Sequence, residues 1–331
     1  MLRVTFYSYK GGVGRTLALL NVAAVLAQAG RRVVAVDLDL EAPGFGLSEL
    51  TRQESKHLGV SDFLLDRRVR GTLPLSDCTY SILRDQCEDR LQLVSVGMRA
   101  GELMRQIPDF YRDPASRDAQ LFQHLVGEID AIMKPDYLFF DSRTGKADVA
   151  GICTVELPQV LVAVCGLNAQ NVHGMEGILR ALTVHPARVE PVATVLALSP
   201  VPRPSDIGLP SPAEVFARYP RGMNVEELAR ERRSNVLLDA IYRAQARLLP
   251  GVWDSFRQVQ PYFPSADWYD DLYHHLPYDP MVPLVDELQI TRDTPLSLAY
   301  QRLALSLTHL HSQDESLEVS DIQRPPILVA A

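Results

Sequence analysis

The chain has 331 residues, of which 47% are hydrophobic, and carries a net charge of -8 with an isoelectric point near 5.5. This length allows a large buried core, and the acidic balance argues against broad electrostatic binding to DNA or to an anionic membrane. No run of about 18 apolar residues is present, so we predict no membrane-spanning segment.

The N-terminal segment is predicted to form a β-α-β unit. Leu2–Tyr7 is a short apolar strand, and Thr16–Gln28 is rich in good helix formers without a breaker. Gly30 stands where a helix C-cap is expected. Arg32–Val36 then gives a second strand, which ends at Asp37.

The middle of the chain repeats this alternation. Its strands are continuous apolar runs, which is typical of strands covered by helices on both faces. The fold class is therefore α/β, with a doubly wound, mostly parallel sheet. The expected strands are Leu91–Val96, Asp136–Phe140, Gln159–Val164 and Val192–Leu198, and the expected helices are Asp118–Ile132 and Met175–Val184.

The pattern breaks in the C-terminal third. Ser199–Pro212 holds five prolines, typical of an irregular connection, and Ala213 to about Leu249 is predicted to be mostly helical. Pro295–Leu310 is a final amphipathic helix. The predicted organisation is one domain over residues 1–310 with a Pro-rich and helical insertion at about 200–275, and a loosely ordered tail at 311–331.

The four cysteines form no C-x-x-C pair, which argues against a zinc site or a thiol redox motif. We expect them to be reduced and mostly buried, as in a cytosolic protein.

A glycine-rich loop lies between the first strand and the first helix. It approximates the phosphate-binding pattern G-x-x-x-x-G-K-[ST], with departures at Tyr9 and Arg15. Its glycines would let backbone N–H groups close around phosphate oxygens, and the helix N-terminus adds partial positive charge. Thr16 offers a hydroxyl to Mg²⁺. The predicted phosphate-binding residues are Gly11, Gly12, Val13, Gly14, Arg15 and Thr16.

Aspartates follow two buried strands further along the chain. Asp37 and Asp39 follow the second strand, and Asp141 follows Tyr137–Phe140. Ligands bind at this edge of open α/β sheets. Phosphoryl-transfer sites of P-loop type hold Mg²⁺ with such an aspartate together with the loop Thr. This order of motifs predicts a nucleotide site in which Thr16 and Asp141 bind the metal.

The run Lys10–Thr16, Lys-Gly-Gly-Val-Gly-Arg-Thr, resembles the deviant Walker A loop of the ParA/MinD family of dimeric ATPases, in a subgroup with Arg in the loop. The resemblance implies a P-loop NTPase fold of the SIMIBI type that binds ATP and Mg²⁺. It also implies that Lys10 reaches the nucleotide of a partner subunit. By the same resemblance, Asp37 would bind Mg²⁺ through water and Asp39 would orient or activate the attacking water.

The resemblance assigns two switch loops. Leu40–Gly44 would be the first and Ser142–Gly145 the second. Arg143 would contact the γ-phosphate or the partner subunit, or would only pair with a nearby acid.

A late Pro-containing loop is similar to the family's loop beside the base and ribose. It points to Pro277 and Asp279 as nucleotide-binding residues, with Met281–Leu288 as the helix that follows. Ser199 stands where the family often has a base-reading Asn or Asp. ATP is therefore favoured over GTP mostly by the resemblance.

Arg15 is predicted to preserve binding better than turnover. It keeps the positive charge of the usual loop lysine but is longer and planar, so a bidentate phosphate contact is plausible. A misplacement of about 1 Å can cost about a hundredfold in rate. We therefore expect a slow ATPase that serves as a switch.

The preferred function is an ATP-dependent homodimerisation switch that positions or recruits an unidentified protein partner. One alternative is an ATP-dependent ligase or synthetase of the cobyrinate or dethiobiotin type, with its substrate pocket in residues 200–275. Another is a bacterial tyrosine kinase, although the tyrosines of residues 262–278 are not at the terminus. DNA binding through arginines at 218–247 is possible but not favoured, because acids interleave them.

Overall fold

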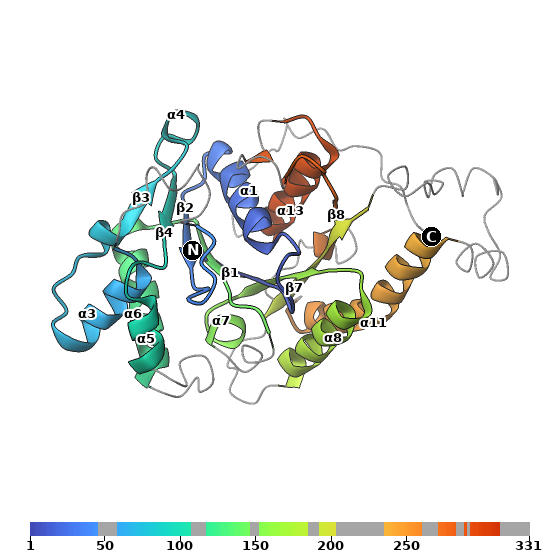
Figure 1. The fold of residues 1–331 in the computed structure, drawn as a ribbon. Coiled ribbons are helices and arrows are strands. Elements are labelled where there is room, and N and C mark those ends of the chain that lie inside the picture. The colour runs from blue at the N-terminus through green and yellow to red at the C-terminus, as the bar shows by residue number, and fades with distance from the viewer. Residues whose placement is uncertain are drawn as a thin grey trace.

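The computed structural model describes residues 1–45, 58–106, 117–145, 152–184, 192–202, 235–259, 271–282, 288–289 and 292–311. Its strands form one sheet in the order β3-β4-β2-β5-β1-β6-β7-β8 (Figure 1). β3 is antiparallel to β4, and the other pairs are parallel. The prediction of an α/β, doubly wound, mostly parallel sheet is confirmed. The strands are β1 (Leu2–Tyr7), β2 (Val33–Asp37), β3 (Thr79–Ser81), β4 (Leu91–Val94), β5 (Tyr137–Asp141), β6 (Val160–Cys165), β7 (Ala193–Val201) and β8 (Tyr273–Pro277).

Helices cover the two faces of the sheet. α1 packs on α13 on one face, whereas α8 packs on α11 on the other, and α3 contacts α5 and α6 at one end (Figure 1). The described helices are α1 (Arg15–Gln28), α3 (Val60–Val69), α4 (Arg84–Cys87), α5 (Ala100–Gln106), α6 (Arg117–Met133), α7 (Ile152–Val155), α8 (Ala169–Val184), α11 (Val236–Val259) and α13 (Pro295–His311), with a 3₁₀ turn at Leu75–Cys78.

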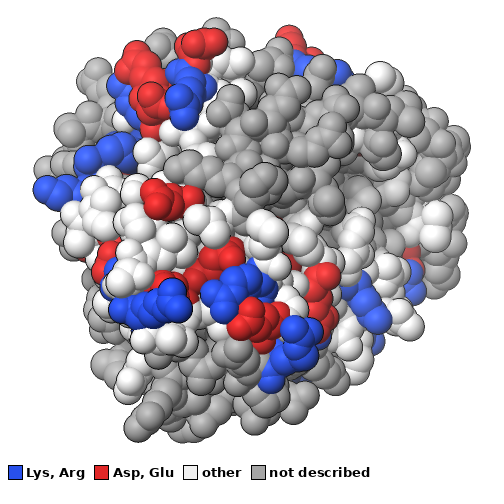
Figure 2. Space-filling model, turned by 60° about the vertical axis from the view of Figure 1, so that its left-hand side comes forward, with Lys and Arg blue, Asp and Glu red and all other residues white. Residues whose placement is uncertain are grey.

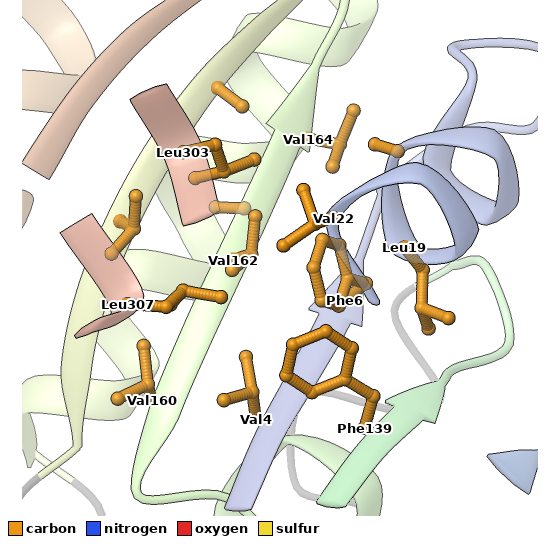
Figure 3. Packing of buried hydrophobic residues seen from close by; sticks show 14 of the residues in the cluster. Val4, Phe6, Leu19, Val22, Phe139, Val160, Val162, Val164, Leu303 and Leu307 are labelled. Atoms are coloured by element: carbon orange, nitrogen blue, oxygen red, sulfur yellow. The ribbon is translucent and has the colours of Figure 1, made fainter. Parts of the chain in front are cut away.

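The central strands are buried on both sides. On β5, Phe139 belongs to the core cluster that contains α1 and α13, and the next residue, Phe140, belongs to the cluster that contains α3 and α6. Figure 3 shows Phe6 and Phe139 side by side beneath α1, and their ring centroids lie 5.2 Å apart. This two-sided burial explains the continuous apolar runs, and it holds the carboxyl ends of β1 and β5 in fixed positions.

The first helix ends as predicted at Gly30. Gly30 has a φ of +86°, and its N–H donates to the carbonyl of Ala27 at 3.0 Å. The N–H of Arg31 donates to the carbonyl of Leu26, also at 3.0 Å. This paired pattern is a Schellman motif, which requires a left-handed residue at the position of Gly30.

Two helix boundaries differ from the prediction, and the first is the start of α8, which lies at Ala169 and not at Met175. We expected the helical segment to end near Leu249, but α11 continues through Pro250 to Val259. A proline inside a helix costs about 3 kcal/mol. Burial outweighs this cost, because each large apolar side chain contributes about 1.5–3 kcal/mol. The side chains buried on this face include Leu248, Val252, Phe256 and Val259.

Some predicted segments lie outside the described residues, and some observed elements were not predicted. The first part of the predicted Ala213–Leu249 helix, most of Met281–Leu288 and residues 312–331 are outside the described ranges. The elements α3, α4, α5, α7 and β3 were not predicted, because they lack a clear periodicity and all but α3 are short.

The expectation that the thiols are buried is confirmed. Cys78, Cys87, Cys153 and Cys165 are all buried, and none of the four is in a disulfide. Among the helices that the structure describes, none combines the length and the hydrophobicity needed to cross a membrane.

Candidate functional site

The glycine-rich loop leaves β1 and leads directly into α1. Gly12 and Gly14 have φ angles of +77° and +78°, which favour glycine, and Gly14 is the N-cap residue of the helix. Gly11 and Gly12 are exposed, and a Cβ on either would meet nothing within 4 Å. Open backbone followed by a helix N-terminus is a geometry suited to a bound anion.

The predicted metal ligands lie together at the carboxyl edge of the sheet. β5 pairs with both β1 and β2, and Asp37 is opposite Asp141 in the register of the neighbouring strands. The hydroxyl of Thr16 donates to Asp141 Oδ2 at 2.5 Å. A hydroxyl and two carboxylates are hard oxygen donors of the kind that Mg²⁺ prefers.

Asp37 is completely buried and holds the segment that follows β2. Its Oδ2 accepts the backbone N–H groups of Gly44 at 2.8 Å and Phe45 at 3.0 Å, and its Oδ1 accepts that of Asp39 at 3.0 Å. Burial, with the negative charge of Asp141, raises the pKa of Asp37 although these backbone donors lower it. The predicted first switch loop is therefore folded back onto the strand that carries Asp37.

This loop also packs against the glycine-rich loop. A Cβ on Gly44 would lie 2.6 Å from Cγ2 of Thr16 and 3.1 Å from its hydroxyl oxygen. The close approach requires the absence of a side chain at Gly44 and brings the first switch loop to the predicted metal ligand.

Arg15 faces the carboxylates. Its Nε donates to Asp141 Oδ1 at 2.5 Å and its Nη2 to Asp39 Oδ2 at 2.9 Å, and its side chain is only 8% exposed. Burial raises the pKa of Asp141, and the charge of Arg15 opposes that rise. Among the residues that the structure describes, the third guanidinium nitrogen, Nη1, is buried without a hydrogen-bond partner. Arg15 thus balances the negative charge of the site and keeps one unused donor there.

The two predicted switch loops contact each other. Arg143 Nη2 pairs with Glu41 Oε2 at 2.7 Å, and a contact of Arg143 with the γ-phosphate or the partner subunit stays a prediction. The hydroxyl of Tyr7 donates to the carbonyl of Gly145 at 2.9 Å, which ties the second loop to the end of β1. A conformational change in one loop would therefore alter the contacts of the other loop.

Ser199 has a role that sequence reasoning did not find. Its hydroxyl donates to the carbonyl of Val13 at 2.8 Å, so the end of β7 holds the glycine-rich loop. A serine after an apolar strand carries no signal for this contact, which depends on the sheet order β1-β6-β7.

Pro277 and Asp279 lie at the same edge of the sheet, at the end of β8. Two strands separate β8 from β1, so this loop is not part of the Thr16–Asp141 cluster. Asp279 Oδ1 accepts the N–H of Met281 at 2.9 Å, and the N–H of Tyr278 donates to Val201 O at 2.7 Å. The role of Pro277 and Asp279 toward a nucleotide stays a prediction.

The described part of the arginine-rich segment is paired with acids. Arg243 lies 3.1 Å from Asp239, and Arg247 lies 3.9 Å from Glu176. Figure 2 presents a different face, the side of α3 and α5, and there too the described basic and acidic side chains lie next to one another. The arginines at 218–233 lie outside the described residues.

A glycine-rich loop between the first strand and helix, with Thr16 bonded to an aspartate at the end of β5, defines a P-loop nucleotide-binding protein. Residues 4–245 match the family model described as the CobQ/CobB/MinD/ParA nucleotide-binding domain. The chain belongs to this family.

Solved structures share this fold. The Aquifex aeolicus MinD cell division protein is 14% identical, with a TM-score of 0.54 and coverage of 93% of this chain and 97% of that one. A Cyanothece McdA variant in complex with ATP is 12% identical, with a TM-score of 0.57 and coverage of 93% and 96%. The Pyrococcus furiosus cell division ATPase MinD is 17% identical, with a TM-score of 0.53 and coverage of 93% and 99%. No curated protein sequence matches the chain.

Proposed function

We propose that this protein is an ATP- and Mg²⁺-dependent dimerisation switch with slow hydrolysis, which acts in the cytosol. The observation that carries the proposal is the hydrogen bond from Thr16 to Asp141 beneath an open glycine-rich loop, with Asp37 in register on the next strand. Family membership and the loop sequence around Lys10 support the choice of ATP and of a dimer.

Thr16, Asp37 and Asp141 would hold the metal. When bound, Mg²⁺ would neutralise charge on the β- and γ-phosphates. Asp39 is the acid assigned to the attacking water, and it is buried and held by Arg15 and by the N–H of Ala42 at 3.2 Å. An acid fixed in this way can keep a water in one orientation.

Arg15 is the residue on which the proposed slow hydrolysis depends. A bound phosphate would compete with Asp39 and Asp141 for the guanidinium of Arg15, since phosphate and carboxylate oxygens both accept its hydrogen bonds. Two of its nitrogens are already committed and one is without a partner among the described residues. Charge on the phosphates is thus still stabilised, whereas a planar arginine replaces the compact lysine at the reacting centre. This combination preserves nucleotide binding and weakens turnover.

Lys10 is the residue proposed to meet the second subunit. It is exposed at the tip of the loop, and its ammonium lies 5.8 Å from the centroid of the Tyr9 ring. Exposure leaves the ammonium available to a phosphate brought by another copy of the chain. A protein partner would then recognise the dimer. A solved complex of the Aquifex aeolicus cell division proteins MinC and MinD has the same fold.

Light scattering coupled to size-exclusion chromatography tests the switch directly. The wild-type protein should be monomeric without nucleotide and dimeric with ATP and Mg²⁺, because ATP would complete the contact surface. Lys10→Ala should remain monomeric, since it removes the cross-subunit contact. Asp39→Ala should accumulate as the dimer, because hydrolysis no longer releases it. One unchanged oligomeric state in all samples would reject the switch.

A further inference from the structure

Tyr9, one of the two departures from the usual loop pattern, is anchored on α8. A Cβ placed on Gly174 would overlap Cδ1, Cε1 and Cγ of the Tyr9 ring. The ring therefore lies against the backbone of the helix, at a position where only glycine leaves room. An isolated glycine within a helix costs up to about 1 kcal/mol relative to alanine, and close packing of this kind is a reason to keep it.

The anchored Tyr9 ring lies close to the ammonium group of Lys10. The ammonium lies 5.8 Å from the ring centroid, within the roughly 6 Å range of a cation–π interaction. A free lysine side chain has about 2 kcal/mol of rotamer entropy to lose when it is ordered. A ring held in place reduces that cost before a second subunit arrives. Ser199 holds the loop at a second position, through the carbonyl of Val13, so the loop is fixed at two points.

A general need for small residues on α8 does not explain this contact. Gly177 lies one turn further along the same helix, and a Cβ there would meet nothing within 4 Å. Of these two glycines, therefore, only Gly174 is required by a neighbour, and that neighbour is the ring beside Lys10.

We propose that Gly174 and Tyr9 are positioning residues that hold Lys10 in the orientation needed to reach the nucleotide of a second subunit. The inference rests on the proposed dimerisation switch. A methyl group at Gly174 would push the ring off the helix and move Lys10, while the hydroxyl of Thr16 and the acids of the site would stay in place.

The test compares Gly174→Ala with Gly177→Ala, which add the same methyl group to the same helix. Gly174→Ala should bind a fluorescent ATP analogue with Mg²⁺ as the wild type does, measured on dilute monomer. Its ATP-dependent dimer should be about tenfold weaker by sedimentation, the loss that corresponds to about 1.4 kcal/mol. Gly177→Ala should dimerise normally. Equal dimer affinities for the two variants would overturn the proposal.

A second arm tests whether Gly174 acts through Lys10. Tyr9→Ala should reproduce Gly174→Ala, and Tyr9→Phe should restore dimerisation because it keeps the ring. In a Lys10→Ala background, which should already be monomeric, Gly174→Ala should leave the affinity for the fluorescent ATP analogue unchanged. A loss of ATP affinity there would show that Gly174 acts through a route other than Lys10.

The positioning of Lys10 can also be measured on the monomer. Pulse acetylation of the nucleotide-free monomer, followed by mass spectrometry, should label Lys10 faster in Gly174→Ala than in the wild type or Gly177→Ala. If no ATP-dependent dimer forms but this difference appears, the proposed function fails and the positioning stands. If the Lys10 labelling rates are equal, the positioning fails whatever the oligomeric state.

Discussion

Replacing Arg15 by alanine should reduce ATP affinity below what calorimetry detects. A hydrogen bond to a charged group contributes about 1.5–3 kcal/mol, so the loss of a bidentate phosphate contact would weaken binding by at least about a hundredfold. The change also leaves the phosphates close to Asp39 and Asp141 with no neighbouring guanidinium. Both effects act in the same direction.

One effect opposes them. Arg15 is bonded to both carboxylates, so nucleotide binding must release part of that interaction, and the alanine variant avoids this cost. The opposing effect is smaller, because Arg15 exchanges one set of charged acceptors for another whereas alanine offers no donor at all. We therefore expect the loss to prevail.

Two measurements separate a loss of ATP affinity from a loss of folding stability in the Arg15 variants. Removal of one partner of a buried ion pair costs about 3–5 kcal/mol, so Arg15→Ala should also unfold at lower temperature without ligand. Arg15→Lys keeps the charge and restores the usual loop residue, and it should bind ATP and raise turnover. ATP binding by folded Arg15→Ala at wild-type strength would show that Arg15 is not a phosphate ligand.

The sequence was sufficient for features that depend on short-range order. The Lys10–Thr16 run, the Asp37 strand end and the Asp141 strand end each have a local pattern, and the parallel topology brings them to one edge. Burial on both faces produces continuous apolar runs, which made β1, β5 and β6 predictable within a residue or two.

The remaining contacts depend on packing between distant segments. The hydrogen bond from Ser199 to Val13 spans 186 positions, and nothing near either residue indicates it. Gly174 could have been noticed only as a glycine next to a predicted helix, without its partner Tyr9. The course of α11 through Pro250 depends on the apolar surface of β7 and α8 that it covers.

The second large effect concerns acid sensitivity and arises far from the glycine-rich loop. His274 on β8 is buried against α13, with Nε2 lying 3.0 Å from Ser306 Oγ and 3.1 Å from the carbonyl oxygen of Asp271. Burial lowers the pKa of His274 from 6.5 to about 4, against the opposing influence of Asp271 and with a small contribution from Arg302. On α13, His309 Nδ1 lies 2.8 Å from Asp271 Oδ1.

The sign follows from the lowered pKa. Above pH 6.5 the ring is neutral in both states, so it contributes no pH dependence. Between pH 6.5 and about 4 the unfolded chain takes up a proton that the folded protein excludes, so stability falls as pH falls. The slope approaches about 1.4 kcal/mol per pH unit, or roughly 3 kcal/mol over the whole window. Below pH 4 both states are protonated and the loss levels off.

Urea unfolding of the wild type and His274→Gln at pH 7 and pH 4.5 measures this contribution. The wild type should lose about 2 to 3 kcal/mol more than the variant between the two values, since glutamine does not titrate. His173→Gln is the matched control, because that ring on α8 is 78% exposed and solvated in both states. It should retain the wild-type acid sensitivity. Equal losses in wild type and His274→Gln would mean that the folded protein accepts a proton at β8 and that α13 does not exclude it.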